Sequence, residues 1–137
     1  MVDVIDKDRQ ALHPTLRSLL DKEAAPDNKF VYCIRCSHLL ARAGDAIKVS
    51  GHHQHFCTNP YGIDFDVCCY RQALGCTISG QPTGADSWFP GYTWRFATCT
   101  GCEAHLGWLF ETTQVISPEH FYGLIAERIQ IDEERKS

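Results

Sequence analysis

The stretch from Trp94 to Phe110 reads WRFATCTGCEAHLGWLF, and it decides the fold. At its centre lies the pair Cys99 and Cys102, separated by Thr and Gly. A C-x-x-C pair places two thiolates on one side of a tight turn, so the flanking aromatic and branched residues are expected to form a hairpin. Counting outward from the turn places Trp94 beside Gly107 or Trp108 on the neighbouring strand.

A second pair, Cys33 and Cys36, precedes the first by 62 intervening residues. Two such turns close a tetrahedral four-sulfur site that has no open position for water, so the metal is expected to be one structural zinc ion. The alternative is a redox motif, which occurs once at a strand–helix junction, whereas this pair occurs twice between β-like flanks. The remaining cysteines lack ligand spacing and are expected to be small buried residues: Cys57, Cys68, Cys69 and Cys76.

Short apolar runs separated by turn residues predict an antiparallel β domain over residues 29–130. The expected strands cover 29–32, 46–50, 55–58, 65–70, 76–79, 92–98 and 106–113. A closing C-terminal helix is predicted over 117–129, because Ser117 suits an N-cap and Phe121, Leu124 and Ile125 share a helical face.

The two ends of the chain are expected to lie outside this domain. Residues 1–28 form an N-terminal appendage in which Leu12, Leu16, Leu19 and Leu20 have the spacing of one helical face. The appendage is predicted to dock on the domain, with a partly ordered tail as the alternative. Residues 131–137 are expected to form a charged tail.

Composition excludes several classes of protein. The 137 residues include 13 Lys and Arg against 17 Asp and Glu, a net charge of −4 that argues against nucleic acid as a partner. No segment is apolar enough to span a bilayer, so no membrane partner is expected. Eight cysteines without a secretory signal favour a reducing, cytoplasmic location.

All three tryptophans fall in the hairpin or in the loop before it. Trp94 and Trp108 lie on the predicted strands, and Trp88 lies in a Pro- and Gly-containing loop. Core packing would explain one such residue, but three clustered indoles favour a pocket for a small ring or a cation. Backbone groups of Asp86 and Trp88, and the Asn59 side chain, are candidate hydrogen-bond partners for a polar ligand.

Several of these motifs together resemble the CULT domain family, the thalidomide-binding domain type of cereblon. The resemblance rests on residues 86–94, the pair Cys99 and Cys102, and residues 105–110 and 117–124. Residues 59–62 and the pair Cys33 and Cys36 also match, so the resemblance covers about 29–129.

The resemblance implies a mainly β fold called a β-tent, in which two antiparallel sheets at a large angle are pinned by the four-cysteine zinc. It also implies a non-enzymatic module whose aromatic cage binds glutarimides or related cyclic imides: thalidomide-type compounds, cyclic imides at protein C-termini, or uridine-like rings. The imide N–H would donate to the backbone carbonyl of Asp86, and an imide carbonyl would accept from the backbone N–H of Trp88. The implied ligand-binding residues are Asn59, Phe65, Asp86, Ser87, Trp88, Trp94, Trp108 and Phe110.

This sequence also departs from the family pattern. Asp86 stands where the family often has His or an aromatic residue, so the alternative function is a cage for quaternary ammonium ligands with Asp86 as the counter-charge. Only about 28 residues precede the match, so a stand-alone, bacterial-type protein without the ubiquitin-ligase adaptor region is expected. Methionine sulfoxide reductases share the architecture but need a nucleophilic cysteine after the second pair. None follows Cys102, so no enzyme activity is expected.

Overall fold

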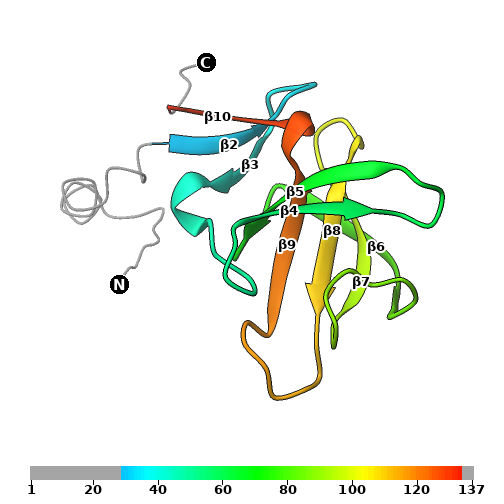
Figure 1. The fold of residues 1–137 in the computed structure, drawn as a ribbon. Coiled ribbons are helices and arrows are strands. Elements are labelled where there is room, and N and C mark those ends of the chain that lie inside the picture. The colour runs from blue at the N-terminus through cyan, green and yellow to red at the C-terminus, as the bar shows by residue number, and fades with distance from the viewer. Residues whose placement is uncertain (1–28, 134–137) are drawn as a thin grey trace.

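The computed structural model describes residues 29–133 (Figure 1). The predicted appendage of residues 1–28, with its leucine stripe, lies outside the described residues. Among the described residues, no helix has the length and apolarity needed to cross a membrane.

The described chain forms two antiparallel sheets, which confirms the mainly β prediction. The small sheet has the order β10-β2-β3, and the large sheet has the order β4-β5-β9-β8-β7-β6. Figure 1 shows the strands of the small sheet running across the direction of β8 and β9. The strands are β2 (Lys29–Cys33), β3 (Leu39–Arg42), β4 (Gln54–Thr58), β5 (Asp64–Tyr70), β6 (Cys76–Thr83), β7 (Thr93–Cys99), β8 (His105–Glu111), β9 (His120–Ile125) and β10 (Ile129–Glu133); the short 3-10 turns are η2 (Ala43–Asp45) and η3 (Ala126–Arg128).

The middle strands of the large sheet are buried on both faces, and β5 shows how. Successive strand residues point to opposite faces, and those of β5 alternate between two hydrophobic clusters. Cys68 and Tyr70 pack in the cluster shared with the small sheet, whereas Val67 and Cys69 pack beneath the loop that joins β6 and β7. The free cysteines of β5 therefore serve as small core residues, as predicted.

The predicted C-terminal helix over 117–129 is wrong. Residues 120–125 form β9, which lies between β5 and β8, followed by the single turn η3 and then by β10. Phe121, Leu124 and Ile125 are all fully buried. Phe121 and Ile125 face one core and Leu124 faces the other, so a strand buried on both faces produces the apolar spacing that suggests a helix.

Two further segments differ from the expected elements. Residues 131–133 belong to β10, which pairs with β2, so the charged tail assigned to 131–137 begins inside a strand. Residues 46–50 were expected as a strand but make only isolated bridges, from Ala46 to Tyr70 and from Val49 to His52.

The hairpin of β7 and β8 is present, but its register differs from the prediction. Trp94 lies opposite Phe110, and Phe96 lies opposite Trp108. The turn is closed by a hydrogen bond from the N–H of Cys99 to the carbonyl of Ala104, and a bulge follows it. Each residue of β7 therefore lies opposite a residue of β8 that is later in the sequence than a turn closed by Cys99 and Cys102 would give. Trp94 and Trp108 are therefore diagonal neighbours on one face of the sheet.

A close backbone contact explains why β8 carries a glycine between its aromatic residues. A Cβ atom on Gly107 would lie 1.9 Å from the carbonyl oxygen of Gly123 on β9. Gly107 therefore makes room for the neighbouring strand rather than for the indoles. This approach holds β8 and β9 together directly behind Trp108.

Candidate functional site

The first cysteine pair occupies the tight turn that follows β2. The N–H of Cys33 donates to the carbonyl of His38 at 2.9 Å, and the N–H of Ser37 donates to the carbonyl of Cys33 at 2.8 Å. Ser37 has a φ of 64°, in the left-handed region, which turns the chain back toward β3.

The second cysteine pair follows β7 and repeats this geometry. The N–H of Cys99 donates to the carbonyl of Ala104 at 2.8 Å, and the N–H of Glu103 donates to the carbonyl of Cys99 at 2.7 Å. Glu103 has a φ of 67°, which matches that of the residue after the first pair. Because the two turns have the same backbone form, each presents its thiols in the same way.

The two turns bring their four sulfur atoms together. The Sγ atoms of Cys33 and Cys102 are 3.7 Å apart, and those of Cys36 and Cys99 are 3.6 Å apart. All four lie within 4.8 Å of one another. A tetrahedral site with metal–sulfur bonds of about 2.3 Å separates its sulfurs by about 3.8 Å, so the cluster fits a four-thiolate metal ion.

The pKa values of the thiols alone do not separate this cluster from the other cysteines, because burial raises the pKa of Cys33 and the pKa of Cys36 is raised to about 12. The backbone N–H of Ala104 lowers the pKa of the Cys102 thiol, which favours the thiolate that a metal needs. Burial raises the pKa of Cys57 to about 11 and those of Cys69 and Cys76 to about 12, so these residues stay protonated. Cys76 lies opposite Cys99 in the β6–β7 ladder but does not belong to the cluster.

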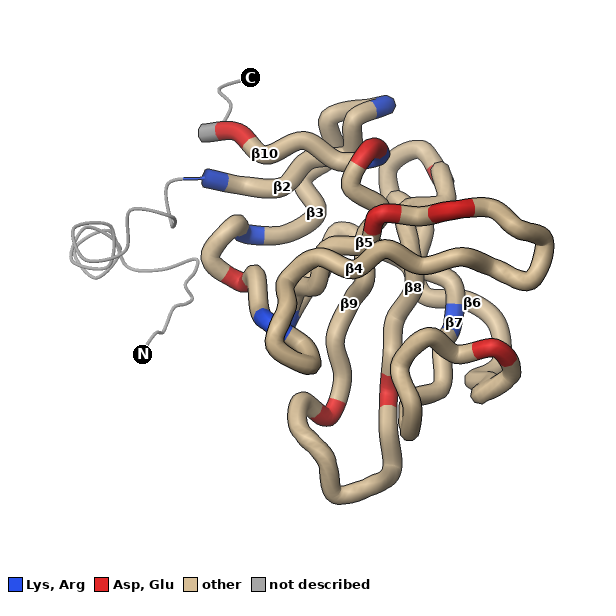
Figure 2. Tube along the Cα trace, viewed as in Figure 1, with Lys and Arg blue, Asp and Glu red and all other residues tan. Residues whose placement is uncertain are grey.

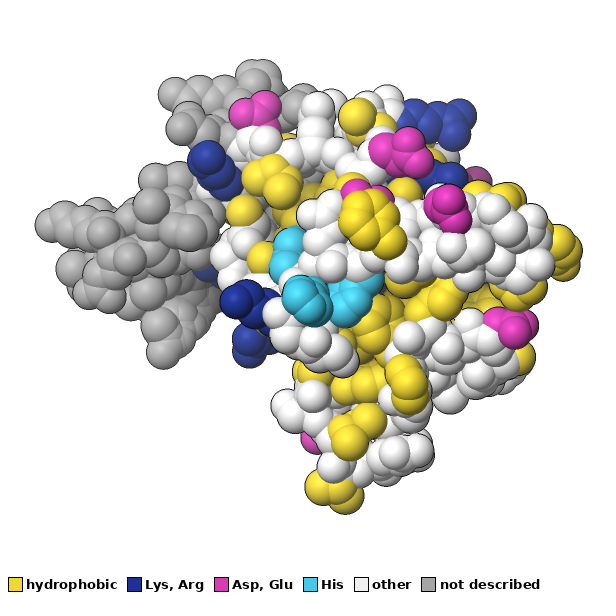
Figure 3. Space-filling view, in the orientation of Figure 1, with side chains coloured by type: hydrophobic (Ala, Val, Ile, Leu, Met, Phe, Trp, Pro, Cys, Tyr) yellow, Lys and Arg dark blue, Asp and Glu magenta, His cyan; other side chains and the backbone are white. Residues whose placement is uncertain are grey.

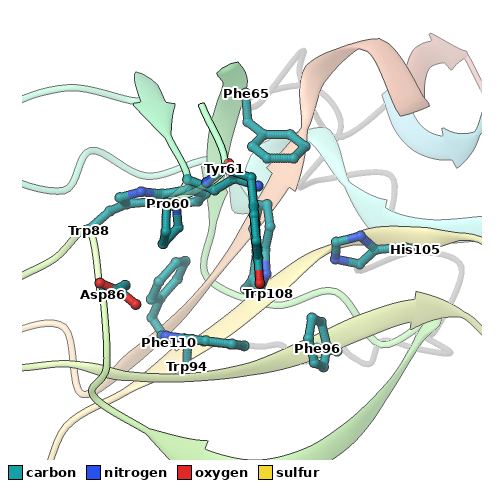
Figure 4. Close-up of a pocket in the computed structure, with 11 residues that line it drawn as sticks. Pro60, Tyr61, Phe65, Asp86, Trp88, Trp94, Phe96, His105, Trp108 and Phe110 are labelled. Atoms are coloured by element: carbon teal, nitrogen blue, oxygen red, sulfur yellow. The ribbon is translucent and has the colours of Figure 1, made fainter. Parts of the chain in front are cut away.

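A second candidate site is a cavity of about 510 Å³ on the large sheet. It lies between the β4–β5 hairpin, the loop joining β6 to β7, and the faces of β7 and β8 (Figure 4). Figure 3 shows hydrophobic side chains gathered in the hollow beneath the hairpin. Seven of the eight predicted ligand-binding residues line the cavity: Asn59, Phe65, Asp86, Trp88, Trp94, Trp108 and Phe110.

The three indoles form walls at large angles to one another. The rings of Trp88 and Trp108 have centroids 4.9 Å apart and an interplanar angle of 87°. The indole N–H of Trp88 donates to the carbonyl of Thr58 at 3.0 Å, and that of Trp94 donates to the carbonyl of Ala85 at 2.8 Å. These bonds fix two rings in place and leave their π faces, rather than their N–H groups, for a ligand.

The deep side of the cavity is packed and apolar. Trp108 is 7% exposed and Phe110 is 1% exposed. Phe110 stacks on Phe121 of β9 with centroids 5.0 Å apart, and Phe65 of β5 meets Trp108 edge to face at 5.3 Å. The floor is therefore held by ring contacts from β9 and, beyond it in the sheet, from β5.

Ser87 shapes the loop and does not line the cavity. Its hydroxyl donates to the carbonyl of Phe89 at 3.1 Å and accepts from the N–H of Phe89 at 3.3 Å. Phe89 is buried against Phe110 at 4.8 Å, which anchors the loop to the core. Asp86 has a φ of 57°, a left-handed conformation that turns the chain before Trp88 enters the cavity.

Asn59 builds the tip of the hairpin that covers the cavity. Its side-chain oxygen accepts hydrogen bonds from the N–H groups of Tyr61 and Ile63, each at 2.9 Å. This turn brings Pro60 and Tyr61, which the sequence analysis did not identify, to the edge of the cavity (Figure 4). In the sequence, the run of Asn59, Pro60 and Tyr61 at a turn between two predicted strands was the signal that could have identified them.

Phe96 and His105 also line the cavity without having been predicted, and they lie at the end away from Asp86 (Figure 4). The Nε2–H of His105 donates to the carbonyl of Gly107 at 2.9 Å, and the ring meets Trp108 edge to face at 5.1 Å. Burial lowers the pKa of His105, and the charge of Arg128 lowers it further. The imidazole is therefore a neutral wall of the cavity.

Arg128 braces this end of the cavity from outside. Its guanidinium donates to the carbonyl of His105 at 2.8 Å and lies 3.5 Å from the Nδ1 of that ring. The guanidinium carbon also lies 6.0 Å from the centre of the Phe65 ring. The carbonyl of Arg128 accepts from the N–H of Ile34, so the same residue connects the first cysteine turn to the cavity wall.

Comparison with known proteins gives a consistent set of relatives. The chain is 34% identical over 111 residues to the protein cereblon of Drosophila willistoni. The matched region covers 77% of this chain and 18% of that protein. The chain is 31% identical over 120 residues to cereblon of Drosophila melanogaster, covering 84% and 20%, and 40% identical over 67 residues to cereblon of Gallus gallus, covering 48% and 15%. The chain thus spans about a fifth of the length of these relatives. No family model matches.

Proposed function

Because most of this chain is homologous to cereblon, consistent with a cereblon-like CULT domain, we propose that it is a non-enzymatic module that binds a cyclic imide in its aromatic cavity. Glutarimides, cyclic imides at protein C-termini and uridine-like rings are the proposed ligands. The observation that carries the proposal is the set of three indoles that line one cavity with two N–H groups already engaged. A flat ring would be held by π faces and by few polar contacts.

Two backbone groups of the loop support this choice of ligand. Within residues 29–133, the carbonyl of Asp86 and the N–H of Trp88 make no hydrogen bond. An imide presents an N–H donor beside carbonyl acceptors. It would therefore satisfy both groups, with its N–H on the carbonyl of Asp86 and a carbonyl oxygen on the N–H of Trp88.

We propose that the metal is a structural zinc ion held by Cys33, Cys36, Cys99 and Cys102. With four thiolates it would supply cross-linking between the two turns and no Lewis acid chemistry toward a ligand. The residues that would bind the ligand act by contact, orientation and exclusion of water. No nucleophile or general base is assigned, and no reaction is proposed.

The test is a titration of the metal-loaded protein with glutarimide, followed by tryptophan fluorescence. We expect saturable quenching in the wild type and its loss in Trp88→Ala. Phe56→Ala is the matched control, because Phe56 is an exposed aromatic residue of β4 that does not line the cavity. The absence of any response at millimolar glutarimide in the folded protein would overturn the proposal.

Asp86 carries the alternative, a cage for quaternary ammonium ligands. Its carboxylate lines the cavity and is exposed, and Figure 2 shows acidic positions on β5 and in the loop joining β6 to β7. A cation enclosed by indole faces beside a carboxylate gains both π and charge interactions. Parallel titrations with choline and glutarimide separate the two functions. Tighter binding of choline that is lost in Asp86→Asn would favour the ammonium cage.

A further inference from the structure

The proposed imide accounts for only one end of the aromatic cavity. A glutarimide is a single small ring, whereas the cavity has a volume of about 510 Å³, within the range of roughly 300–1,000 Å³ that holds larger ligands. With its polar edge on the backbone of Asp86 and Trp88, the ring would lie among the indoles. Phe96 and His105 line the far end of the cavity, away from Asp86 (Figure 4). The cavity therefore has room for a substituent on the ring.

The walls of the far end suit an apolar group. The Phe96 ring meets those of Trp94 and His105 edge to face, with centroids 5.2 and 5.5 Å away, and it is 43% exposed. The Nε2–H of His105 already donates to the carbonyl of Gly107, and its Nδ1 faces the guanidinium of Arg128. His105 therefore offers its ring to a ligand and not a polar atom. An apolar side chain against Phe96 would remove exposed aromatic surface from water.

The charge of the cavity also limits the substituent. Of the described residues that line it, Asp86 alone carries a formal charge, and it lies at the opposite end from Phe96 (Figure 4). Arg128 braces His105 from outside and does not line the cavity. A charged group at the far end would therefore leave water without an opposite charge beside it, which costs free energy.

An amide group on the hairpin tip indicates how the substituent is joined to the ring. The side-chain oxygen of Asn59 already accepts from the N–H groups of Tyr61 and Ile63. Its NH₂ group makes no hydrogen bond within residues 29–133, although Asn59 lines the cavity. This NH₂ group can donate to a carbonyl oxygen beside the ring. A polypeptide supplies such a carbonyl, because the preceding residue acylates a cyclic imide that forms at its C-terminus.

We infer that the cavity binds the last two residues of a polypeptide, a C-terminal cyclic imide among the indoles and an apolar residue before it against Phe96 and His105. The NH₂ group of Asn59 would donate to the carbonyl that joins the two. This inference rests on the proposed imide function and adds to it the class of partner: polypeptides whose C-terminal imide follows an apolar residue. Phe96 and Asn59 are the residues that determine this specificity.

The test compares three short peptides that end in the same aminoglutarimide and carry phenylalanine, glycine or glutamate before it. Calorimetric titration of the metal-loaded protein should show about tenfold tighter binding of the phenylalanine peptide than of the glycine peptide, with the glutamate peptide weakest. In Phe96→Ala, the ratio of the phenylalanine to the glycine affinity should fall close to one. Phe56→Ala, which changes an exposed aromatic residue outside the cavity, should keep the wild-type ratio.

Asn59→Asp separates the carbonyl contact from the hairpin turn. The carboxylate can still accept from the N–H groups of Tyr61 and Ile63, but it lacks the NH₂ donor. The glycine peptide has the joining carbonyl and unsubstituted glutarimide does not. The ratio of their affinities should therefore fall about fivefold in this variant.

The outcomes separate this inference from the proposed function. If glutarimide binds but the phenylalanine and glycine peptides bind equally, or the glutamate peptide binds best, the inference is overturned and the imide function stands. A phenylalanine preference that persists in Phe96→Ala would also overturn it. If glutarimide and all three peptides fail to bind the folded protein, the proposed function fails and this inference fails with it.

Discussion

The cysteine cluster and the aromatic cavity share the β7–β8 hairpin but are built in different ways. The cluster consists of two copies of one local turn, each closed by the same two backbone hydrogen bonds. The cavity draws on β5, β7, β8 and two connecting loops, and its walls are held by side chains that are far apart in sequence. The first site depends on a motif of four residues, whereas the second depends on the register of a whole sheet.

The largest expected effect comes from removing a ligand of the cluster. Cys99→Ser should lose the metal and with it the folded state, because a structural zinc contributes about 10–16 kcal/mol of apparent binding free energy. Metal content and circular dichroism measure the two losses. Cys76→Ser is the control, since Cys76 faces Cys99 across the ladder but lies outside the cluster. A folded, metal-free Cys99→Ser protein would contradict the assigned role.

The next effect concerns the strand that connects the two regions. Gly107→Ala places a Cβ atom 1.9 Å from the backbone oxygen of Gly123, so β8 and β9 must separate. We expect a loss of about 3 kcal/mol in the free energy of unfolding, measured with urea. Gly84→Ala, at a position with open space around it, should change stability little. Equal losses of stability in the two variants would show that the close approach of β8 to β9 at Gly107 does not determine the stability of the protein.

A smaller effect should show how Arg128, outside the cavity, changes the pKa of His105 in the cavity wall. Because the folded state binds a proton at His105 less readily than the unfolded chain does, the free energy of unfolding should fall as the pH drops below about 6.5. Arg128→Met removes a charge that lowers this pKa, so the pKa of His105 should rise and the pH dependence should weaken. NMR titration of the ring measures the pKa. An unchanged pKa of His105 in Arg128→Met would show that the Arg128 charge does not lower it.

The smallest effect tests how far ligand binding depends on the orientation of the Trp94 ring, as distinct from its area. Trp94→Phe keeps an aromatic wall but removes the N–H that donates to Ala85. Loss of one such bond is worth about 1 kcal/mol, so the free energy of unfolding should fall by about that amount, and the freed ring should lower glutarimide affinity by at most about fivefold. Calorimetric titration beside Phe56→Ala tests this difference. A loss as large as that of Trp88→Ala would mean that indole area, and not orientation, limits binding.

The same contrast explains which features the sequence predicts. The cysteine cluster and the β7–β8 hairpin follow from local spacing, and the three tryptophans follow from the hairpin. Phe96 shares the face of Trp94 by strand alternation alone and was available from the sequence, whereas His105 was missed because a bulge near Thr98 changes the register and so decides which side of β8 it shares with Trp108. The helix expected over 117–129 failed because burial on both faces of β9 removes the alternation that marks a strand.

The positions of the two cysteine turns in the chain also matter for the unfolded state. A metal that joins Cys36 to Cys99 closes a ring of polypeptide, and 62 residues lie inside it. Asn59, Phe65, Trp88 and Trp94 fall within this ring. In the chain-entropy model, a cross-link around a loop of that length removes about 4 kcal/mol of freedom from the disordered chain. The metal would thus favour assembly of the distant cavity walls by limiting how far they can diffuse apart.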